Sequence, residues 1–370
     1  MTQQLYIRPI ALAESPQSEE GDAVRLAGGL VYASRFALIV RQDGQVVSRR
    51  RVGVGQMPQA LADLPDALGA EGEAQWSDLR GAYPPLQAGA RTLRLDQPQV
   101  MGVLNVTPDS FSDGGKFLDK PDEALAHAHA MLEAGAAIID VGGESTRPNA
   151  PAVWEGDEAK RVVPVIERLA ASGAAISIDT RRASVMEAAL AAGAHIINDI
   201  SALRHDPRAM DIVASAGVPV VLMHAPGDGA DPHADGDYGD VVLDVFDALR
   251  QRRDAAIAGG IARGNILLDP GIGFGKSLAE NLALINALPL FHALGQPIVF
   301  GASRKRMIGA LSNEAAAHKR LGGSLALALR AFDTACHIVR VHDVPETVQA
   351  LHIWRGLRDA ALTDFTQLGA

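Results

Sequence analysis

Short apolar runs alternate with amphipathic segments from residue 100 onward. Uninterrupted runs of Val, Ile and Leu are typical of strands that are buried on both faces of a parallel sheet. They predict eight strands, at residues 100–106, 137–141, 175–179, 195–199, 219–223, 266–269, 297–301 and 337–341. Apolar positions at helical spacing predict the helices between and after them, at residues 122–134, 158–171, 183–192, 209–216, 241–258, 278–288, 321–335 and 345–357.

Alternating strands and helices favour a parallel sheet that is covered by helices. The expected fold class is α/β, and the expected architecture is a (β/α)8 TIM barrel, because eight successive units can close such a sheet into a barrel. A doubly wound open sheet is the alternative, and the count of eight strands disfavours it.

The first 89 residues carry a different pattern and predict a small N-terminal α+β extension. Residues 5–10, 31–40 and 45–54 are predicted strands, and Asp43-Gly44 is a good hairpin signal. The other predicted segments are a short helix at 60–68, loops at 13–21 and 69–85, and a strand at 91–95 that plugs the barrel. We therefore expect an appendage over residues 1–89 and a catalytic barrel over residues 90–370. The appendage could also be a regulatory or oligomerising module, and no residue pattern decides this.

Composition narrows the class of protein. The hydrophobic fraction of 48% and the charged fraction of 21% are ordinary for a globular chain. The net charge of −10 gives no support to a nucleic-acid partner. Cys336 is the single cysteine, which excludes an intramolecular disulfide and fits a reducing compartment. We expect a cytoplasmic protein, because neither a secretory signal nor an apolar run long enough to span a membrane is visible.

The predicted strands carry polar residues at their C-terminal ends. In a barrel of this kind the active site lies at that rim, whereas purely structural polar groups would be scattered over both ends. Nearly every strand end contributes an amide or a charged group: Asn105; Glu144 and Arg147; Asp179 and Arg181; Asn198 and Asp199; His224; Asp269 and Lys276; Arg304 and Lys305; Arg340, His342 and Asp343.

One half of this rim suits a flat, neutral ring. Asp179, Asn198 and Asp269 offer carboxylate and amide groups, which can pair with an amino-pyrimidinone edge. The glycines of residues 271–275 permit close approach of the backbone to a planar ligand. The apolar side chains of the same half are Ile200, Met223 and Phe274.

The other half of the rim is basic. Arg340 and His342 are two residues apart at a strand end, so they face the same side and suit a phosphate or diphosphate. Asn105 lies opposite, Arg147 lies on the second loop, and Lys305 lies between the two halves. The predicted ligand therefore has a planar head and an anionic tail.

Taken singly, each of these signals also has a structural explanation. Together they occupy one rim, which the structural explanations do not require. The alternatives are a local backbone contact for Asn105, a helix cap for Asp179, a turn for residues 269–271, a surface turn for residues 303–305, and an ion pair with Asp343 or Glu346 for Arg340 and His342.

Seven motifs extend this pattern over about residues 90–360. They are NVTPDSFSDGG at 105–115, GGESTRP at 142–148, IDT at 178–180, ND at 198–199, LDPGIGFGK at 268–276, SRK at 303–305 and RVHD at 340–343. In this order they closely resemble the motif set of the dihydropteroate synthase family, which uses a TIM barrel. The resemblance implies a transferase that joins p-aminobenzoate to 6-hydroxymethyl-7,8-dihydropterin diphosphate, giving 7,8-dihydropteroate and pyrophosphate in folate biosynthesis.

The resemblance also implies a role for each matched position. The pterin is expected to contact Asp179, Asn198, Met223, Asp269, Phe274, Gly301 and Lys305. The diphosphate is expected to contact Asn105, Arg340 and His342, and Asn105 is expected to help hold Mg2+ as the cofactor. The p-aminobenzoate is expected to contact Phe111, Thr146, Arg147, Pro148 and Ser303. The expected catalytic residues are Asp179, Lys305, Arg340 and His342.

The resemblance further implies a homodimer formed through the outer helices, and mobile substrate loops at residues 105–115 and 142–150. Two features depart from the family pattern. Residues 1–89 lie outside it, and the loop at residues 224–238 matches it only at Met223-His224. This loop is a candidate determinant of access to the site.

Two other functions compete with the synthase. A pterin-dependent methyltransferase shares the pterin-binding barrel, but it needs neither Arg340 and His342 nor the motif at 105–115. A pterin-binding module without catalysis is the second alternative, and the intact Asn105 and Lys305 argue against it. Release of pyrophosphate only in the presence of both substrates would distinguish the synthase from both.

Overall fold

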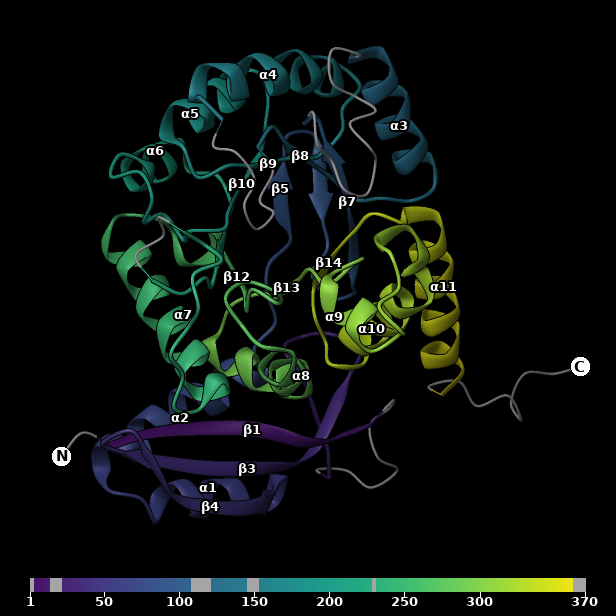
Figure 1. Cartoon of the computed structure of the whole chain (residues 1–370). Coiled ribbons are helices and arrows are strands. Elements are labelled where there is room, and N and C mark those ends of the chain that lie inside the picture. Colours follow the sequence, from purple (N-terminus) through teal and green to yellow (C-terminus); the bar gives the residue numbers. More distant parts are fainter. Residues whose placement is uncertain (1–2, 14–21, 108–120, 145–152, 228–230, 362–370) are drawn as a thin grey trace, which may run out of the picture.

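The computed structural model describes residues 3–13, 22–107, 121–144, 153–227 and 231–361 of the 370-residue chain. In these residues, helices surround a central barrel, and a separate antiparallel sheet lies below it (Figure 1). The eight barrel strands are parallel, in the order β12-β11-β10-β9-β8-β7-β14-β13. A parallel bridge between Leu268 and Ile298 joins the two ends of this order. The TIM-barrel prediction is confirmed, and the open-sheet alternative is wrong.

Every predicted barrel strand is present, with bounds that differ from the prediction by at most two residues. The strands are β7 (Gln99–Asn105), β8 (Ile138–Gly142), β9 (Ile176–Asp179), β10 (Ile196–Asp199), β11 (Val220–Met223), β12 (Ile266–Asp269), β13 (Val299–Phe300) and β14 (Ile338–Val341). β13 is shorter than predicted. Pro297 precedes it, and a proline cannot donate a hydrogen bond to a neighbouring strand.

The predicted helices cover the outside of the barrel. They are α3 (Pro121–Glu133), α4 (Glu155–Ala171), α5 (Ala183–Ala191), α6 (Ala209–Ala216), α7 (Val241–Ala258), α8 (Leu278–Asn286), α10 (Leu321–Asp333) and α11 (Val344–Ala361). α8 ends before the predicted residue 288, because Pro289 has no N–H to donate to the carbonyl four residues earlier, and the chain continues as a 3-10 helix from Leu288. The short elements are η2 (Arg263–Asn265), η3 (Leu288–Leu294), α9 (Arg306–Ala310) and η4 (Ala317–Lys319). In the described part of the chain, no helix is long and apolar enough to cross a membrane.

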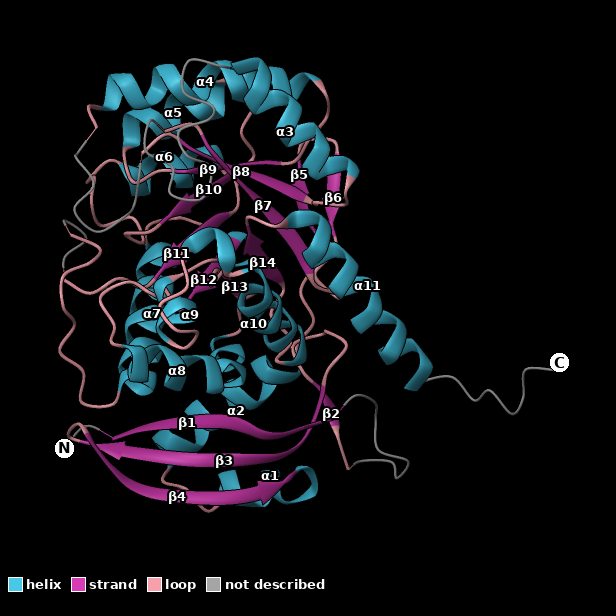
Figure 2. Cartoon of the chain, turned by 45° about the vertical axis from the view of Figure 1, so that its right-hand side comes forward, coloured by secondary structure: helices cyan, strands magenta, loops and turns pink. Residues whose placement is uncertain are grey.

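The appendage is a small antiparallel sheet with helices packed on it. Strands β1 (Gln3–Ala13) and β4 (Gln45–Gly53) pair with the two edges of β3 (Tyr32–Gln42), and β2 (Val24–Arg25) also pairs with β3. Figure 2 shows this sheet outside the barrel, below α8 and α2. Its buried apolar residues belong to the same hydrophobic cluster as those of the barrel helices, so the two parts share a core.

The helices of the appendage differ from the prediction. The chain continues from β4 through η1 (Val54–Gln56) into α1 (Met57–Ala62) and α2 (Asp66–Arg80). The predicted helix at 60–68 is wrong because Pro65 separates two helices and is the N-cap of α2. The predicted loop at 69–85 is wrong for most of its length. Gly72 suggested a loop, but a Cβ there would lie 2.6 Å from Leu61 and 2.8 Å from Leu5, so the glycine permits close packing within the appendage.

Helix α2 shields the outer edge of β1. The Gln75 side chain accepts a hydrogen bond from the Ile7 N–H at 2.9 Å and donates one to the Leu5 carbonyl at 2.6 Å. Glu71 accepts from the Leu5 N–H at 3.1 Å. Two side chains thus take the place of a further strand, which protects an edge that could otherwise pair with another chain.

A hairpin closes the end of the barrel at which its strands begin. β5 (Leu86–Ala88) pairs with β6 (Arg91–Leu93), and their apolar residues cluster with the first residues of the barrel strands. The predicted plug is therefore present. The expected boundary between residues 89 and 90 falls inside this hairpin.

Candidate active site

The register of the barrel brings three predicted polar residues to one level of the rim. Asn105 is paired across the sheet with Gly142, Gly142 with Asp179, and Asp179 with Asn198. A Cβ placed on Gly142 would lie 3.3 Å from Asn105 Oδ1 and 3.7 Å from the Asp179 Cβ atom. Side chains that are far apart in the sequence therefore lie beside one another.

A buried ion network forms the floor of the site. Arg340 donates from Nε to Asp140 Oδ2 at 2.6 Å and from Nη2 to Asp179 Oδ2 at 2.7 Å. Asn198 Nδ2 donates to the same Asp140 oxygen at 3.2 Å. One guanidinium group thus compensates two carboxylates from different strands, as buried charges require.

Sequence analysis missed Asp140. This residue is fully buried in β8, inside the apolar run Ile138–Gly142, two residues before the predicted rim. The signal was the charge itself, because a carboxylate in a buried strand must be paired. Its Oδ1 atom has no hydrogen-bond partner within the described residues, which leaves an unused acceptor in the barrel interior.

Burial changes the ionisation of two carboxylates in the site. Burial raises the pKa of Asp179; Arg340 opposes the rise, and the charge of Asp140 adds to it. Burial also raises the pKa of Asp269, and Lys305 opposes that rise. Perturbed groups gathered in one place are typical of functional sites.

Asp269 and Lys305 lie on the other side of the floor. The Gly271 N–H donates to Asp269 Oδ1 at 2.7 Å, so the turn predicted as an alternative accounts for one oxygen of this carboxylate. Lys305 Nζ donates to the Ile272 carbonyl and lies 4.5 Å from the centre of the Phe274 ring. Burial lowers the pKa of Lys305 to about 8, although Asp269 opposes this.

Residues 270–276 form a tight loop that requires glycine. Gly271 has φ +68°, and a Cβ there would lie 1.9 Å from the His224 carbonyl oxygen. Lys276 Nζ donates to the carbonyls of Gly271 at 2.9 Å and Phe274 at 3.0 Å. Lys276 thus stabilises the loop by hydrogen bonds within it.

An apolar cluster lines the same half of the site. It contains the three residues expected from the sequence and one more: Ile200, Met223, Phe274 and Ala225. Gly301 lies opposite, where a Cβ would be 3.7 Å from the Arg340 Cβ atom and 3.9 Å from Asp269 Oδ2.

His342 is held by Ser303. The His342 N–H donates to Ser303 Oγ at 3.2 Å, and the same hydroxyl lies 3.1 Å from His342 Nδ1. Burial and the charges of nearby cations, Arg340 first among them, lower the pKa of His342 to about 3. Ser303 was expected on the p-aminobenzoate side, and here it contacts a residue expected at the diphosphate.

Two of the structural alternatives are wrong. Asp343 accepts from Arg304 Nε at 3.0 Å, and Arg340 pairs with Asp140 and Asp179 instead. The helix after β9 begins at Ala183, and its cap residue is Arg182, so Asp179 does not cap it.

The residues expected at the p-aminobenzoate side are largely outside the described part of the chain. These residues are Phe111, Thr146, Arg147 and Pro148. The last described residue before the second loop is Glu144, which accepts from Arg182 Nη2 at 2.7 Å. The same Glu144 carboxylate also accepts from the Val153 N–H at 3.5 Å, and Val153 is the first described residue after this loop.

The described residues hold no cluster of three or more His, Cys, Asp or Glu side chains that could bind a metal ion. The candidate ligand is the Asn105 side-chain oxygen, which lies next to Asp179. Mg2+ in phosphate-binding sites usually keeps several waters and takes few protein oxygens besides the phosphate. One amide oxygen at the rim therefore fits such an ion bound with a diphosphate.

Comparison with known proteins decides the family. The profile of the pterin binding enzyme family matches residues 101–342. The dihydropteroate synthase of Bacillus subtilis is 46% identical over 248 residues, which are 67% of this chain and 84% of that protein. The chain belongs to the dihydropteroate synthase family. The Escherichia coli K12 member is 46% identical over 269 residues, 72% of this chain and 94% of the relative. The resemblance noted in the sequence is thereby confirmed.

Another relative is longer. A probable bifunctional folylpolyglutamate synthase/dihydropteroate synthase of Haloferax volcanii is 45% identical over 308 residues. The match covers 82% of this chain and 36% of that protein, so the chain spans about a third of its length.

Solved structures of the family have the same fold. Xanthomonas albilineans dihydropteroate synthase with 4-aminobenzoic acid has a TM-score of 0.70 and 48% identity, covering 75% of this chain and 98% of that one. The Burkholderia cenocepacia enzyme complexed with 7,8-dihydropteroate has a TM-score of 0.69 and 41% identity, covering 76% and 98%.

Proposed function

We propose that this protein is a dihydropteroate synthase, which joins p-aminobenzoate to 6-hydroxymethyl-7,8-dihydropterin diphosphate and releases pyrophosphate in folate biosynthesis. The observation that carries the proposal is the convergence of Asp179, Asn198, Asp269, Lys305 and Arg340 on one rim. Family membership supports it, as do relatives solved with 4-aminobenzoic acid and with 7,8-dihydropteroate. The catalytic barrel would be residues 90–370 together with β5, which completes the hairpin at its end, and the appendage would be the residues before β5.

The pterin ring is assigned to the buried half of the site. Carboxylates accept the N–H groups of the ring, the amide of Asn198 pairs with its donor–acceptor edge, and Lys305 donates to a ring acceptor. A buried, water-poor floor strengthens these contacts. The assigned residues are Asp179, Asn198, Met223, Asp269, Phe274, Gly301 and Lys305.

The diphosphate is assigned to Asn105, Arg340 and His342. His342 is neutral at pH 7, because its pKa is lowered to about 3 by burial and by nearby cations. The Ser303 hydroxyl oxygen accepts from the backbone N–H of His342, so the hydroxyl can donate its proton to His342 Nδ1. The ring proton of the neutral imidazole is then on Nε2, which can donate to a phosphate oxygen. Asn105 would hold Mg2+ together with the diphosphate, and the ion would neutralise charge on the leaving group.

The p-aminobenzoate is assigned to Phe111, Thr146, Arg147 and Pro148, with Ser303 at the border with the diphosphate. Arginine is suited to the carboxylate of this substrate because its fork matches two oxygens. The arylamine would then face the CH2 carbon of the pterin.

The reaction needs no nucleophile from the protein. The amine nitrogen attacks the CH2 carbon, the carbon–oxygen bond breaks, and its electron pair leaves with pyrophosphate; the nitrogen then gives one proton to water or to the departing pyrophosphate. Asp179 and Asp269 in their ionised forms favour positive charge on the ring, and Arg340 and His342 favour negative charge on the leaving group. Each developing charge is thus matched by groups of the opposite sign.

We also propose a cytoplasmic homodimer formed through the outer helices. Ile353 and Leu357 lie one turn apart on α11 and are 65% and 64% exposed. Leu329 on α10 is 36% exposed. Apolar side chains at helical spacing on a surface suit contact with a second copy.

Pyrophosphate release tests the function. Release that requires both the dihydropterin diphosphate and p-aminobenzoate supports the synthase, with 7,8-dihydropteroate as the second product. Pterin binding without turnover would favour an inactive module. Methyl transfer from a reduced folate in place of pyrophosphate release would favour the methyltransferase alternative, which also shares the barrel.

A further inference from the structure

The appendage lies along helix α7 and meets it with opposite charge. Three aspartates lie on one face of the start of this helix, at positions 240, 244 and 247. Arg49 Nη2 is 3.9 Å from Asp240, Arg41 Nη1 is 2.6 Å from Asp244, and the Tyr6 hydroxyl donates to Asp247 at 2.8 Å. The sheet therefore follows α7 up to its N-cap residue, Asp240.

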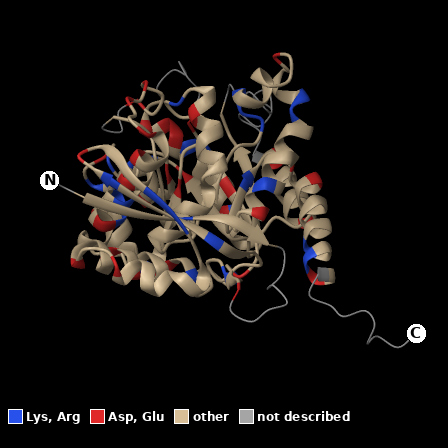
Figure 3. Cartoon of the chain, turned by 90° about the horizontal axis from the view of Figure 1, so that it is seen from below, with Lys and Arg blue, Asp and Glu red and all other residues tan. Residues whose placement is uncertain are grey.

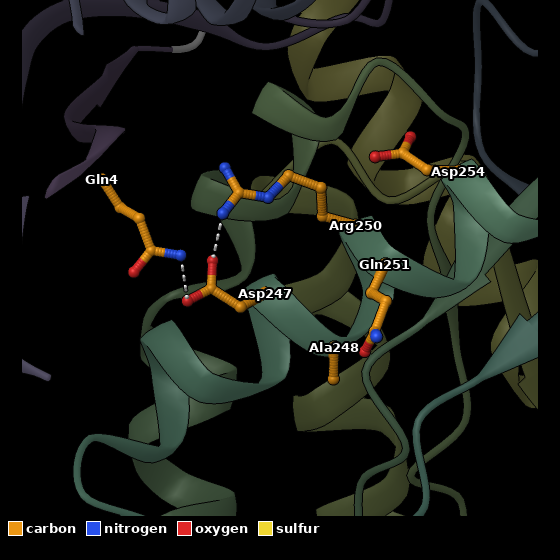
Figure 4. A pocket seen from close by; sticks show the side chains of 6 residues that line it. All are labelled: Gln4, Asp247, Ala248, Arg250, Gln251 and Asp254. Carbon is orange, nitrogen blue, oxygen red and sulfur yellow. Dashed lines mark hydrogen bonds and ion pairs between the residues drawn. The ribbon is translucent and has the colours of Figure 1, made fainter. Parts of the chain in front are cut away.

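The lower part of this contact lines a surface groove of about 560 Å3. Figure 4 shows Gln4 and Arg250 reaching Asp247 from two sides, at 3.2 Å and 2.8 Å. Gln4 belongs to β1 and the other lining residues belong to α7, so the groove lies at the contact between appendage and barrel.

The upper part of the contact reaches the active-site rim. Helix α7 follows β11, so its first residues and the preceding loop lie at the C-terminal ends of the barrel strands. The exposed arginines of β4, Arg49 to Arg51, belong to the appendage sheet, which faces the viewer in Figure 3. Through Arg41 and Arg49, strands β3 and β4 thus bring the appendage to the end of the barrel that carries the candidate active site.

Arg41 and the end of this loop bind opposite oxygens of one carboxylate. Asp244 Oδ1 accepts from Arg41, and Asp244 Oδ2 accepts from the N–H groups of Gly239 at 2.8 Å and Asp240 at 3.0 Å. Arg41 is only 9% exposed, whereas the Asp244 side chain is 25% exposed, so the ion pair is partly shielded from solvent. Asp240 in turn caps α7 by accepting from the N–H groups of Val242 and Leu243.

The described part of the same loop packs on the assigned pterin wall. His233 is stacked on Phe274, with ring centres 5.0 Å apart and planes at 17°. The Gly236 N–H donates to the Gly275 carbonyl at 3.2 Å. Lys305 lies close to the same Phe274 ring, at 4.5 Å from its centre. Displacing the loop would therefore remove a stacking partner from Phe274, whose ring also contacts Lys305.

We propose that Arg41 is a positioning residue for the pterin site, and that the appendage serves to brace residues 231–240, the described end of the loop between β11 and α7, from outside the barrel. The line of contact runs from Arg41 through the Asp244 carboxylate to Gly239, and from Gly236 and His233 to Phe274. This inference rests on the proposed function, because it uses the assignment of Phe274 and Lys305 to the pterin. It gives a purpose to the two features that depart from the family pattern.

The test compares steady-state kinetics of full-length variants. Arg41→Ala should raise the KM for dihydropterin diphosphate roughly twofold to thirtyfold, the effect of a mutation coupled to a site at a distance. The KM for p-aminobenzoate should change by less than about twofold, since its assigned residues belong to other segments of the chain than the loop before α7. Arg41→Lys should recover most of the loss, because it keeps the charge opposite Asp244.

Arg263→Ala is the matched control. Arg263 Nη2 pairs with Asp78 on α2 at 3.1 Å, so this variant also removes an arginine between barrel and appendage. Arg263 lies just before β12, however, at the end of the barrel opposite the candidate active site. It should leave both KM values unchanged even if the melting temperature falls. Asp244→Asn replaces Arg41→Ala if that variant does not fold, and it should act in the same direction.

The outcomes separate the two proposals. A wild-type enzyme without two-substrate pyrophosphate release overturns the synthase; binding of the dihydropterin measured by calorimetry then tests the brace by itself. If the wild type is active and Arg41→Ala leaves the pterin KM unchanged, the brace is wrong and the synthase stands. Equal losses for both substrates, or equal losses in Arg263→Ala, would show a general effect on stability and would also overturn the brace.

Discussion

Replacing Asp140 with asparagine removes one of the two negative charges around Arg340 and keeps the shape of the side chain. Asp140 Oδ2 accepts from Arg340 Nε at 2.6 Å and from Asn198 at 3.2 Å, and an asparagine oxygen in the same place can accept both. The new NH2 group takes the place of Oδ1, which has no partner within the described residues. The substitution therefore changes charge more than packing.

The main expected effect is on Asp179. Burial raises its pKa to about 7 against the opposing charge of Arg340, and the charge of Asp140 adds to the rise. Without Asp140 the pKa of Asp179 should fall by at least about one pH unit, which is ~1.4 kcal/mol, because two charges about 4 Å apart interact by about 4 kcal/mol at an effective dielectric constant of about 20. The hydrogen bonds that lose their charge should cost about 2 kcal/mol of stability.

The sign of the stability change with pH follows from the same shift. A carboxyl group with a higher pKa in the folded state binds its proton more tightly there. Stability therefore falls as pH rises from the unfolded pKa of about 4 to the folded pKa of about 7. In Asp140→Asn this fall should be smaller, because the two pKa values of Asp179 lie closer together. Urea unfolding at several pH values measures the difference between variant and wild type.

Activity gives the second measurement. Ionised Asp179 is the form that accepts ring N–H groups, so kcat/KM for the dihydropterin diphosphate should decline on the acid side near pH 7. In Asp140→Asn that decline should move to lower pH by about one unit. Asp254→Asn is the control, since it removes the same charge from a side chain that is 57% exposed. An acid limb that stays in place, or that moves to higher pH, refutes the reasoning.

Three further outcomes are expected. Gln75→Met should lower the free energy of unfolding by about 3 kcal/mol, because it leaves two buried backbone groups of β1 without partners; a loss below about 0.5 kcal/mol in urea would contradict the edge-shielding role. Gly271→Ala should abolish activity or soluble expression, since its Cβ would lie 1.9 Å from the His224 carbonyl oxygen, whereas Gly264→Ala, with open space around it, should behave as wild type. Removing Mg2+ with EDTA should stop pyrophosphate release and adding it should restore release, with Asn105→Ala needing more Mg2+ for half-maximal rate; full activity in EDTA would exclude this role.

The barrel and its polar rim could be predicted because both follow from the order of apolar and polar residues within short segments of the sequence. Each buried strand is a short apolar run, and each ends in polar residues that the barrel topology must place on one side. The error at residues 69–85 had a local cause as well. Gly72 weakens any helix prediction, and only its packing against Leu61 and Leu5 explains why the helix continues through it.

Asp140 shows where local patterns stop. Within an apolar run it is an isolated charge, and the neighbouring residues do not indicate which cation pairs with it. Arg340 follows it by 200 positions and lies on another strand, so only the closed sheet brings them within 2.6 Å. The same holds for Arg41 and Asp244, which belong to different parts of the chain.

The sequence by itself determined the succession of strands and helices, the end of the barrel that carries the chemistry, and the family. These follow from hydrophobic periodicity and from motifs in which neighbouring residues act together. The tertiary structure decided which charges share the guanidinium of Arg340, how α2 covers the edge of β1, and that the appendage reaches the loop beside Phe274. The reason is physical: hydrogen bonds and ion pairs depend on distances of about 3 Å, and between residues far apart in the chain those distances exist only after the strands have taken up their register.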